Sequence, residues 1–159
     1  MCSTSPTTDE MRSVRAAVFV VDASPSRVTE FLSNPRNLVA ANHAGPIIEG
    51  SDPPVAAGSW FVVAFDQLRM RVEYGVFEPS RRVAGTITWT GRLSGGTRSS
   101  FDFVLTPEAD GTRTRIAAML EGRGNPIVTT LSRLAQPLVA RQMRARFQAR
   151  LAELPESPD

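Results

Sequence analysis

The stretch NPIVTTLSRLAQPLVARQMRARFQARLAEL, which runs from Asn125 to Leu154, predicts one long helix at the end of the chain. Its apolar residues recur at intervals of three or four, the spacing of one helix face. Asn125 suits the cap position of such a helix, and Pro126 suits its first turn. The helix would extend about 44 Å at roughly 1.5 Å per residue, so only a broad sheet could cover its apolar stripe. We therefore expect a long helix that lies across a sheet and encloses a cavity.

Pro137 is the irregular point of this predicted helix. Proline removes a backbone donor, and the apolar stripe changes register between Leu138 and Val139, so we expect a bend there. The bend could widen a pocket or let the first half of the helix gate it. It could equally be a fixed bend that follows the curvature of the sheet.

The sequence before the helix predicts strands joined by short turns. Val14–Val21 is nearly all apolar, as a strand covered on both faces would be. Ser24-Pro25 and Asn34-Pro35 each combine a helix cap with a proline, which predicts two short helices in succession. Apolar and alternating segments mark the later strands at Ile47–Ile48, Ser59–Phe65, Leu68–Phe77, Val83–Thr90, Phe101–Leu105 and Thr112–Leu120. This order indicates an α+β fold with an antiparallel meander.

Composition limits the class of protein. The chain has 159 residues and 42% hydrophobic content, which fits one domain at residues 12–154 between a disordered leader, residues 1–11, and a tail, residues 155–159. The chain has no apolar run of membrane-spanning length, and its leader lacks a signal-peptide core, so we expect a cytoplasmic protein. Cys2 and His43 are the only cysteine and histidine, so we expect neither a disulfide nor a structural zinc site.

Every one of the 18 cationic residues is arginine. Arginine forks suit phosphate or carboxylate recognition, but a GC-rich genome would produce the same bias without a function. The arginines are scattered except in the last helix, at Arg141, Arg144, Arg146 and Arg150. With a net charge of +2 and no interleaved aromatic residues, the case for nucleic-acid binding is weak.

Three stretches carry a resemblance to a known superfamily. Val21–Pro35, VDASPSRVTEFLSNP, resembles the strand, the A-x-P-x-x-V helix start and the D/N-P break of START-like, or SRPBCC, proteins. Phe77–Val83, FEPSRRV, resembles their E-P-P-R-R-L turn, and Asp110–Thr114, DGTRT, resembles their G-D-G-T-R-V-T hairpin. Together with the closing helix, these stretches make the chain similar to the polyketide cyclase/dehydrase group from Arg12 to Leu154.

The resemblance implies a helix-grip fold, in which a curved antiparallel sheet of about seven strands wraps around the long helix and leaves a pocket. Members of the superfamily bind lipids, hormones, polyketides and other hydrophobic ligands; some are enzymes, and many are carriers or sensors. The family often has a tryptophan near the pocket mouth, shortly after the second short helix. Leu38–His43 occupies this place here, so we expect an altered mouth.

The alternating positions predict an apolar lining with a few polar tips, the usual make-up of a small-molecule pocket. The sheet would supply Phe61, Val63, Met70, Val72, Tyr74, Ile87, Trp89, Phe101, Phe103 and Leu120, and the helix would supply Leu131, Leu134 and Leu138. Apart from the resemblance, the same residues would also suit a filled core. Trp89 could stack on a planar ligand or only pack against its neighbours.

His43 and Tyr74 are the candidates for catalysis. His43 could take an acidic proton from a β-keto substrate, or it could be an exposed loop residue. Tyr74 could donate a hydrogen bond to a developing enolate, or it could be a core residue with a satisfied hydroxyl. Arg69 and Arg71 fall on the outer face, and only a bulge would bring one of them inward to a ligand carboxylate.

The sequence thus predicts a protein that binds a hydrophobic small molecule between a sheet and its last helix, with polyketide cyclase or dehydratase activity as the enzyme hypothesis. A non-catalytic carrier or sensor of a lipid-like ligand is one alternative. A module that binds RNA or protein through its arginine-rich helix end is another. We expect no cofactor, because the sequence has no nucleotide-binding or dinucleotide-binding motif, and we leave a homodimer open.

Overall fold

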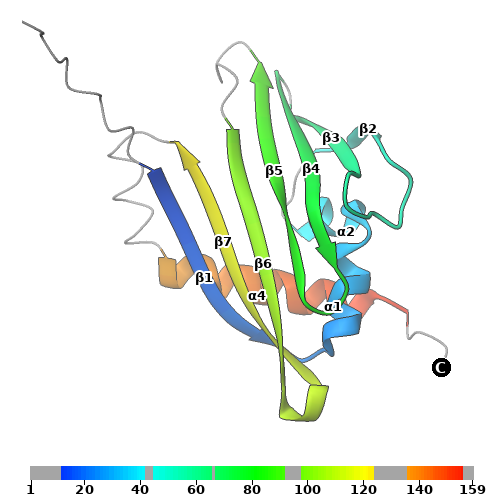
Figure 1. Ribbon diagram of the computed structural model, residues 1–159, viewed down its shortest axis with the longest axis vertical. Helices are drawn as coiled ribbons and strands as arrows, with labels where there is room; N and C mark the ends of the chain where they lie inside the picture. The colour runs from blue at the N-terminus through cyan, green and yellow to red at the C-terminus, as the bar shows by residue number, and fades with distance from the viewer. Residues whose placement is uncertain (1–11, 42–44, 66, 92–97, 124–135, 156–159) are drawn as a thin grey trace, which may run out of the picture.

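The computed structural model describes residues 12–41, 45–65, 67–91, 98–123 and 136–155 (Figure 1). The elements follow one another as β1 (Arg12–Val21), α1 (Pro25–Leu32), α2 (Pro35–Ala41), β2 (Ile47–Gly50), β3 (Trp60–Phe65), β4 (Leu68–Glu78), β5 (Arg82–Gly91), β6 (Arg98–Glu108), η1 (Ala109–Gly111), β7 (Arg113–Arg123) and α4 (Gln136–Glu153). Each strand and short helix predicted from the sequence therefore has a counterpart. The first part of the predicted long helix, residues 125–135, lies outside the described residues.

The seven strands form one antiparallel sheet in the order β1-β7-β6-β5-β4-β3-β2. Strands β2 to β7 are a meander, and β1 joins it by pairing with β7, so β1 and β2 are the edges. Helix α4 crosses one face of this curved sheet, and α1 lies against the same face near one end (Figure 1). This arrangement confirms the helix-grip fold. We call the face toward α4 the concave face and the opposite one the convex face.

The hydrophobic core lies between the concave face and the helices. Helix α1 contributes Val28, Phe31 and Leu32, which lie on its buried face, and α4 contributes Phe147 and Leu151. The sheet contributes Ala17, Phe19, Val21, Phe61, Val63, Val72, Tyr74, Val83, Phe101, Leu105, Ile116 and Ala118. The spacing of three and four in each helix and of two in each strand places these residues on the inner face, as the sequence predicted.

Strand β1 is covered on one face only. Ala17 and Phe19 are buried, whereas Val18 between them is 61% exposed on the convex face. The prediction of a strand covered on both faces is therefore wrong. The apolar run has only its concave face covered, because α1 and α4 lie on that side of the sheet and leave the convex side of β1 open.

A bulge in β4 changes which side chains face inward. Tyr74 pairs with Gly85, but the next paired residue is Val76, which lies opposite Ala84, so Gly75 is an extra residue on this strand. Tyr74 and Phe77 consequently share the concave face, with their ring centroids 6.1 Å apart. The predicted alternation through Val76 is wrong beyond Tyr74, because a bulge inserts one residue and reverses the later side chains.

The caps of the two short helices agree with the sequence. Ser24 Oγ accepts a hydrogen bond from the backbone N–H of Arg27 at 3.3 Å, which caps α1. Asn34 Oδ1 accepts one from the backbone N–H of Arg36 at 3.1 Å, at the start of α2. These contacts satisfy donors that a helix start leaves without a partner.

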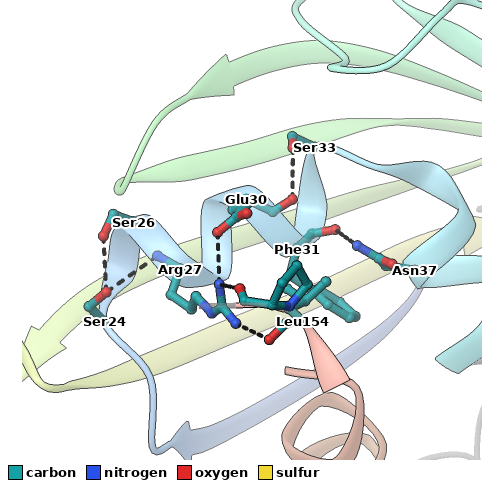
Figure 2. Close-up of polar contacts among 9 residues, drawn as sticks. Ser24, Ser26, Arg27, Glu30, Phe31, Ser33, Asn37 and Leu154 are labelled. Atoms are coloured by element: carbon teal, nitrogen blue, oxygen red, sulfur yellow. Dashed lines mark hydrogen bonds and ion pairs between the residues drawn. The ribbon is translucent and has the colours of Figure 1, made fainter. Parts of the chain in front are cut away.

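Arg27 connects α1 to the end of α4 (Figure 2). Its guanidinium donates to the carbonyl oxygens of Leu154 and Pro155 and forms an ion pair with Glu30 at 3.2 Å. Gln148 of the same helix accepts a hydrogen bond from the backbone N–H of Asp22 at 2.8 Å. The C-terminal part of α4 is therefore fixed to the corner where β1 meets α1.

Pro137 is the second residue of α4 as described. The predicted bend depends on the segment before it, which lies outside the described residues, so the bend stays a prediction.

Candidate functional site

The strand register arranges the concave side chains in rows across the sheet. The inner row, which lies under α4, contains Val83, Phe103, Ala118 and Ala17. The tyrosine row follows, with Tyr74, Gly85, Phe101 and Leu120. The middle row contains Phe61, Val72, Ile87 and Ser99, and the end row contains Val63, Met70 and Trp89.

Burial decreases toward the end row on β4 and β5. Tyr74 and Val72 on β4 and Val83 on β5 are buried, whereas the concave side chains nearer the end row on these two strands, at the start of β6 and at the end of β7 are half-buried. We call this group the half-buried patch; its members are Met70, Ile87, Trp89, Ser99 and Leu120. It is an apolar surface with one hydroxyl, and it lies on the face that the fold directs toward the helix.

Aromatic rings connect this patch to the core. The Tyr74 ring lies 6.1 Å from that of Phe61 and 5.9 Å from that of Phe101, the latter edge-on at 88°. Phe101 contacts Phe103 at 5.8 Å, and Phe103 contacts Phe147 of α4 at 6.1 Å. Edge-on and tilted contacts are the favoured geometries of aromatic pairs, so a continuous series of ring contacts connects Tyr74 to Phe147 of α4.

The Tyr74 hydroxyl is the exceptional polar group of this face. Its oxygen is buried and has no hydrogen-bond partner in the part of the chain that the structure describes. Burial raises the pKa of Tyr74 well above its ordinary value near 10, because the phenolate would lose its hydration. The group therefore remains a neutral hydrogen-bond donor near neutral pH.

Gly85 makes room for these rings. A Cβ atom built at this position would lie 2.0 Å from the Glu73 carbonyl oxygen and 2.8 Å from Cζ of Phe101. The residue pairs with Tyr74 at the start of the bulge, where β4 and β5 come unusually close. Only glycine fits here without a shift of the β4 backbone.

The sheet side chains predicted as ligand contacts all lie on the concave face. Phe61, Val63, Val72, Tyr74 and Phe101 are buried, and Met70, Ile87, Trp89, Phe103 and Leu120 are half-buried. Their contact with a ligand stays a prediction. His43, Leu131 and Leu134 lie outside the described residues, so the structure does not bring His43 together with Tyr74 or separate them.

Leu138 does not lie on the inner face of α4; it is 58% exposed. The helix packs through Ala140, Met143, Phe147 and Leu151, and a residue two positions before Ala140 points about 200° away from this stripe. The predicted placement of Leu138 on the sheet-facing wall is therefore corrected.

Arg69 and Arg71 lie on the convex side, as their register predicted. The bulge in β4 follows them at Gly75, so it turns neither of them inward. The Arg71 guanidinium instead lies 4.0 Å from the ring centroid of Trp60 and 3.3 Å from Glu73. Neither arginine is in place to hold a ligand on the concave face.

The arginine-rich end of α4 keeps much of its charge in solvent. Arg141 and Arg144 are exposed, and Arg150 pairs with Glu153 of the same helix at 2.6 Å. Binding of RNA or protein through this helix end stays a prediction.

Sequence reasoning missed Ser99, Gly85 and Phe77. Ser99 precedes the predicted strand, so its prediction would have required the true start of β6 at Arg98. The Gly75 signal for a bulge was available, because glycine inside an alternating strand often marks one. It would have placed Phe77 on the concave face.

In the described ranges, no group of three or more His, Cys, Asp or Glu residues could hold a metal ion. A search of the same ranges finds no helix that is both long and apolar enough to cross a membrane.

Comparisons with known proteins agree with this architecture. Residues 11–157 match the family described as polyketide cyclase / dehydrase and lipid transport. Curated proteins give no match to the sequence.

Three solved structures show the likeness of fold. Mll3558 from Rhizobium loti is 17% identical with a TM-score of 0.61, over 86% of this chain and 97% of that one. DynU16, from the dynemicin biosynthetic locus, is 18% identical with a TM-score of 0.60, over 88% of this chain and 47% of that one. Norcoclaurine synthase from Thalictrum flavum, solved with dopamine and hydroxybenzaldehyde, is 13% identical with a TM-score of 0.62, over 99% and 98% of the two chains.

Identities this low show the fold alone, but the family match covers residues 11–157, which is nearly the whole chain. The chain therefore belongs to the polyketide cyclase / dehydrase and lipid transport family, within the START-like superfamily.

Proposed function

We propose that this protein binds an apolar, ring-containing small molecule on the half-buried patch, between the sheet and its last helix. The observation that carries the proposal is the patch itself. Met70, Ile87, Trp89 and Leu120 are apolar side chains that remain partly exposed on a concave face, where the neighbouring Tyr74 and Val83 are buried. Covering this surface with a ligand would remove apolar area from water, which is the main driving force for such binding.

The family description and one structural neighbour support a ligand of this kind. The family description names polyketide cyclases, dehydrases and lipid transport, and lipids are largely apolar molecules. The norcoclaurine synthase structure holds dopamine and hydroxybenzaldehyde, which are small aromatic molecules. The comparison applies to that protein, and its relevance here is part of the proposal.

The enzyme version of the proposal is a polyketide cyclase or dehydratase. In an aldol cyclisation, a base removes a proton from the carbon beside a carbonyl, and the resulting enolate carbon bonds to a second carbonyl carbon. The oxygen of that second carbonyl gains negative charge and then a proton. Tyr74 would donate a hydrogen bond to the oxygen of the developing enolate, and His43 is the candidate base from the sequence. We also propose a cytoplasmic location.

The two tryptophans of the chain allow a direct binding test. Trp89 lies on the concave face beside Met70, and Trp60 lies on the convex face under Arg71. Titration with 1-bromonaphthalene, a neutral ring compound that quenches tryptophan only on close contact, should quench Trp89. Trp60→Phe should retain most of the saturable quenching, and Trp89→Phe should lose most of it, because heavy-atom quenching requires contact with the indole ring.

Equal quenching of both single-tryptophan variants, or no saturable binding, would contradict the proposed site. Turnover separates the enzyme from the carrier. If Tyr74→Phe and His43→Ala each leave a demonstrated cyclisation at full rate, their catalytic roles are wrong. Binding without any product would identify a carrier or sensor.

A further inference from the structure

Buried hydroxyls of this chain are otherwise hydrogen-bonded in the described residues. Thr114 Oγ1 donates to the Ala23 carbonyl at 2.7 Å. Thr29 Oγ1 donates to the Pro25 carbonyl at 2.9 Å and accepts from the backbone N–H of Ser80 at 2.7 Å. Tyr74, which is 1% exposed, is the exception, since its hydroxyl has no such partner. A buried polar group without a partner carries a free-energy cost, so its persistence calls for an explanation.

The Tyr74 ring cannot easily turn its hydroxyl toward water. The rings of Phe61, Phe77 and Phe101 surround it at centroid distances of 6.1, 6.1 and 5.9 Å. Phe101 also covers Gly85, the residue paired with Tyr74 on the neighbouring strand. The donor is therefore held in a fixed place, in the row that adjoins the half-buried patch.

We infer that Tyr74 makes the site selective for uncharged aromatic ligands that carry a carbonyl oxygen, which accepts the hydrogen bond of its hydroxyl. This inference rests on the proposed function and deepens it, because it names the class of ligand. A carbonyl oxygen satisfies the donor, and the flat ring system covers Ile87 and Trp89 in the adjoining rows.

Apart from Arg15, which the β1–β7 register places opposite Leu120, the charge distribution of these rows disfavours an anionic ligand. No arginine, aspartate or glutamate is among the described side chains of the tyrosine, middle and end rows. Arg71, the nearest cation along β4, is on the other face over Trp60. A carboxylate placed on the patch would lose hydration without a described counter-ion. The free-energy cost of that loss exceeds the gain from one neutral hydrogen bond. The raised pKa of Tyr74 agrees with a donor that stays neutral.

Three probes that share one ring frame test this selectivity. Fluorenone carries a carbonyl, fluorene carries none, and fluorene-9-carboxylate carries a negative charge. Their affinities can be measured from Trp89 quenching in the Trp60→Phe background. We expect fluorenone to bind about three- to tenfold more tightly than fluorene, the ratio that one net hydrogen bond gives. The carboxylate should bind most weakly. This third probe is needed because Arg15 pairs with Leu120 in the β1–β7 register.

Tyr74→Phe keeps the ring and removes only the hydroxyl. We expect it to remove the preference for fluorenone over fluorene while fluorene still binds. The unliganded variant should unfold at the same or a higher denaturant concentration than the wild type, since it lacks a buried donor without a partner. Thr114→Val is the matched control: it removes a satisfied hydroxyl, so it should lower stability and leave the preference unchanged.

The outcomes separate the inference from the function on which it rests. Equal binding of fluorene and fluorenone, a preference that survives in Tyr74→Phe, or tightest binding of the carboxylate would each overturn the inference and leave ligand binding in place. Failure of all three probes to bind would overturn the proposed function and the inference with it. A Tyr74→Phe variant less stable than the wild type would show that the hydroxyl serves the fold and would also overturn the inference.

Discussion

At the scale of single residues, the site depends on one glycine and one tyrosine in adjacent strands. Gly85 allows β4 and β5 to approach at the bulge, and Tyr74 presents a neutral donor to the concave face. Simple alternation along the strand predicted the inner face for Tyr74, whereas the role of Gly85 was not predicted. The sequence could not predict that the Tyr74 hydroxyl lacks a partner in the described residues, because this depends on side chains from three different strands.

Gly85→Ala should destabilise the protein. The added Cβ would lie 2.0 Å from the Glu73 carbonyl oxygen, so the β4 backbone must shift, and overpacking of this kind costs about 1–3 kcal/mol. Gly75→Ala is the control on the facing strand, because its Cβ would meet nothing closer than the Ala84 carbonyl oxygen at 3.9 Å. Urea unfolding of both variants checks this. Equal effects of the two substitutions would show that the close approach at Gly85 is absent.

Tyr74 should make stability fall in alkaline solution. Its pKa is higher in the folded protein than in the unfolded chain, where it is near 10. The free energy of unfolding therefore keeps its full value below about pH 10 and falls as the pH rises above it. The loss should reach about 1.4 kcal/mol by about pH 11, and Tyr74→Phe should not show it. The chain has one tyrosine and no lysine, so tyrosinate absorbance reports this group alone. Ionisation at the same pH in folded and unfolded protein would contradict the buried placement.

At the scale of elements, periodicity predicted the strands and short helices well, because each buries one face. The sequence was less informative where a neighbour decides the outcome. Val18 is exposed because no helix covers the convex side of β1, and Phe77 turns inward because of the bulge at Gly75. The contact between Arg27 and the end of α4 joins residues more than a hundred positions apart, and no local pattern indicates it.

Arg27→Met should loosen the end of α4. The substitution removes the donors to the carbonyls of Leu154 and Pro155 and a positive charge near a helix C-terminus, so we expect a loss of about 1–2 kcal/mol. Hydrogen exchange should become faster at the last turn of the helix. Arg150→Met is the control, since this arginine pairs only locally in the described contacts, and its effect should stay within about 0.5 kcal/mol. Unchanged exchange in Arg27→Met would refute this anchoring role.

At the scale of the whole molecule, two apolar surfaces compete as ligand sites. The concave half-buried patch includes Met70, whereas the convex face exposes Val18, Val104 and Met119, the last at 48%. The order of elements and the family resemblance predicted the concave choice from the sequence. They could not predict that apolar residues also gather on the convex face, because this group forms only when β1, β7 and β6 lie side by side.

Photo-crosslinking with benzophenone tests the concave site most directly. This molecule is an uncharged aromatic ketone, the ligand class proposed for the site, and on irradiation it reacts readily with nearby methionine side chains. Peptide mapping by mass spectrometry then compares Met70 on the concave face with Met119 on the convex face. We expect saturable labelling of Met70 that fluorenone suppresses. Labelling confined to Met119, or labelling of Met70 that fluorenone does not reduce, would contradict a ligand site between the sheet and its helix.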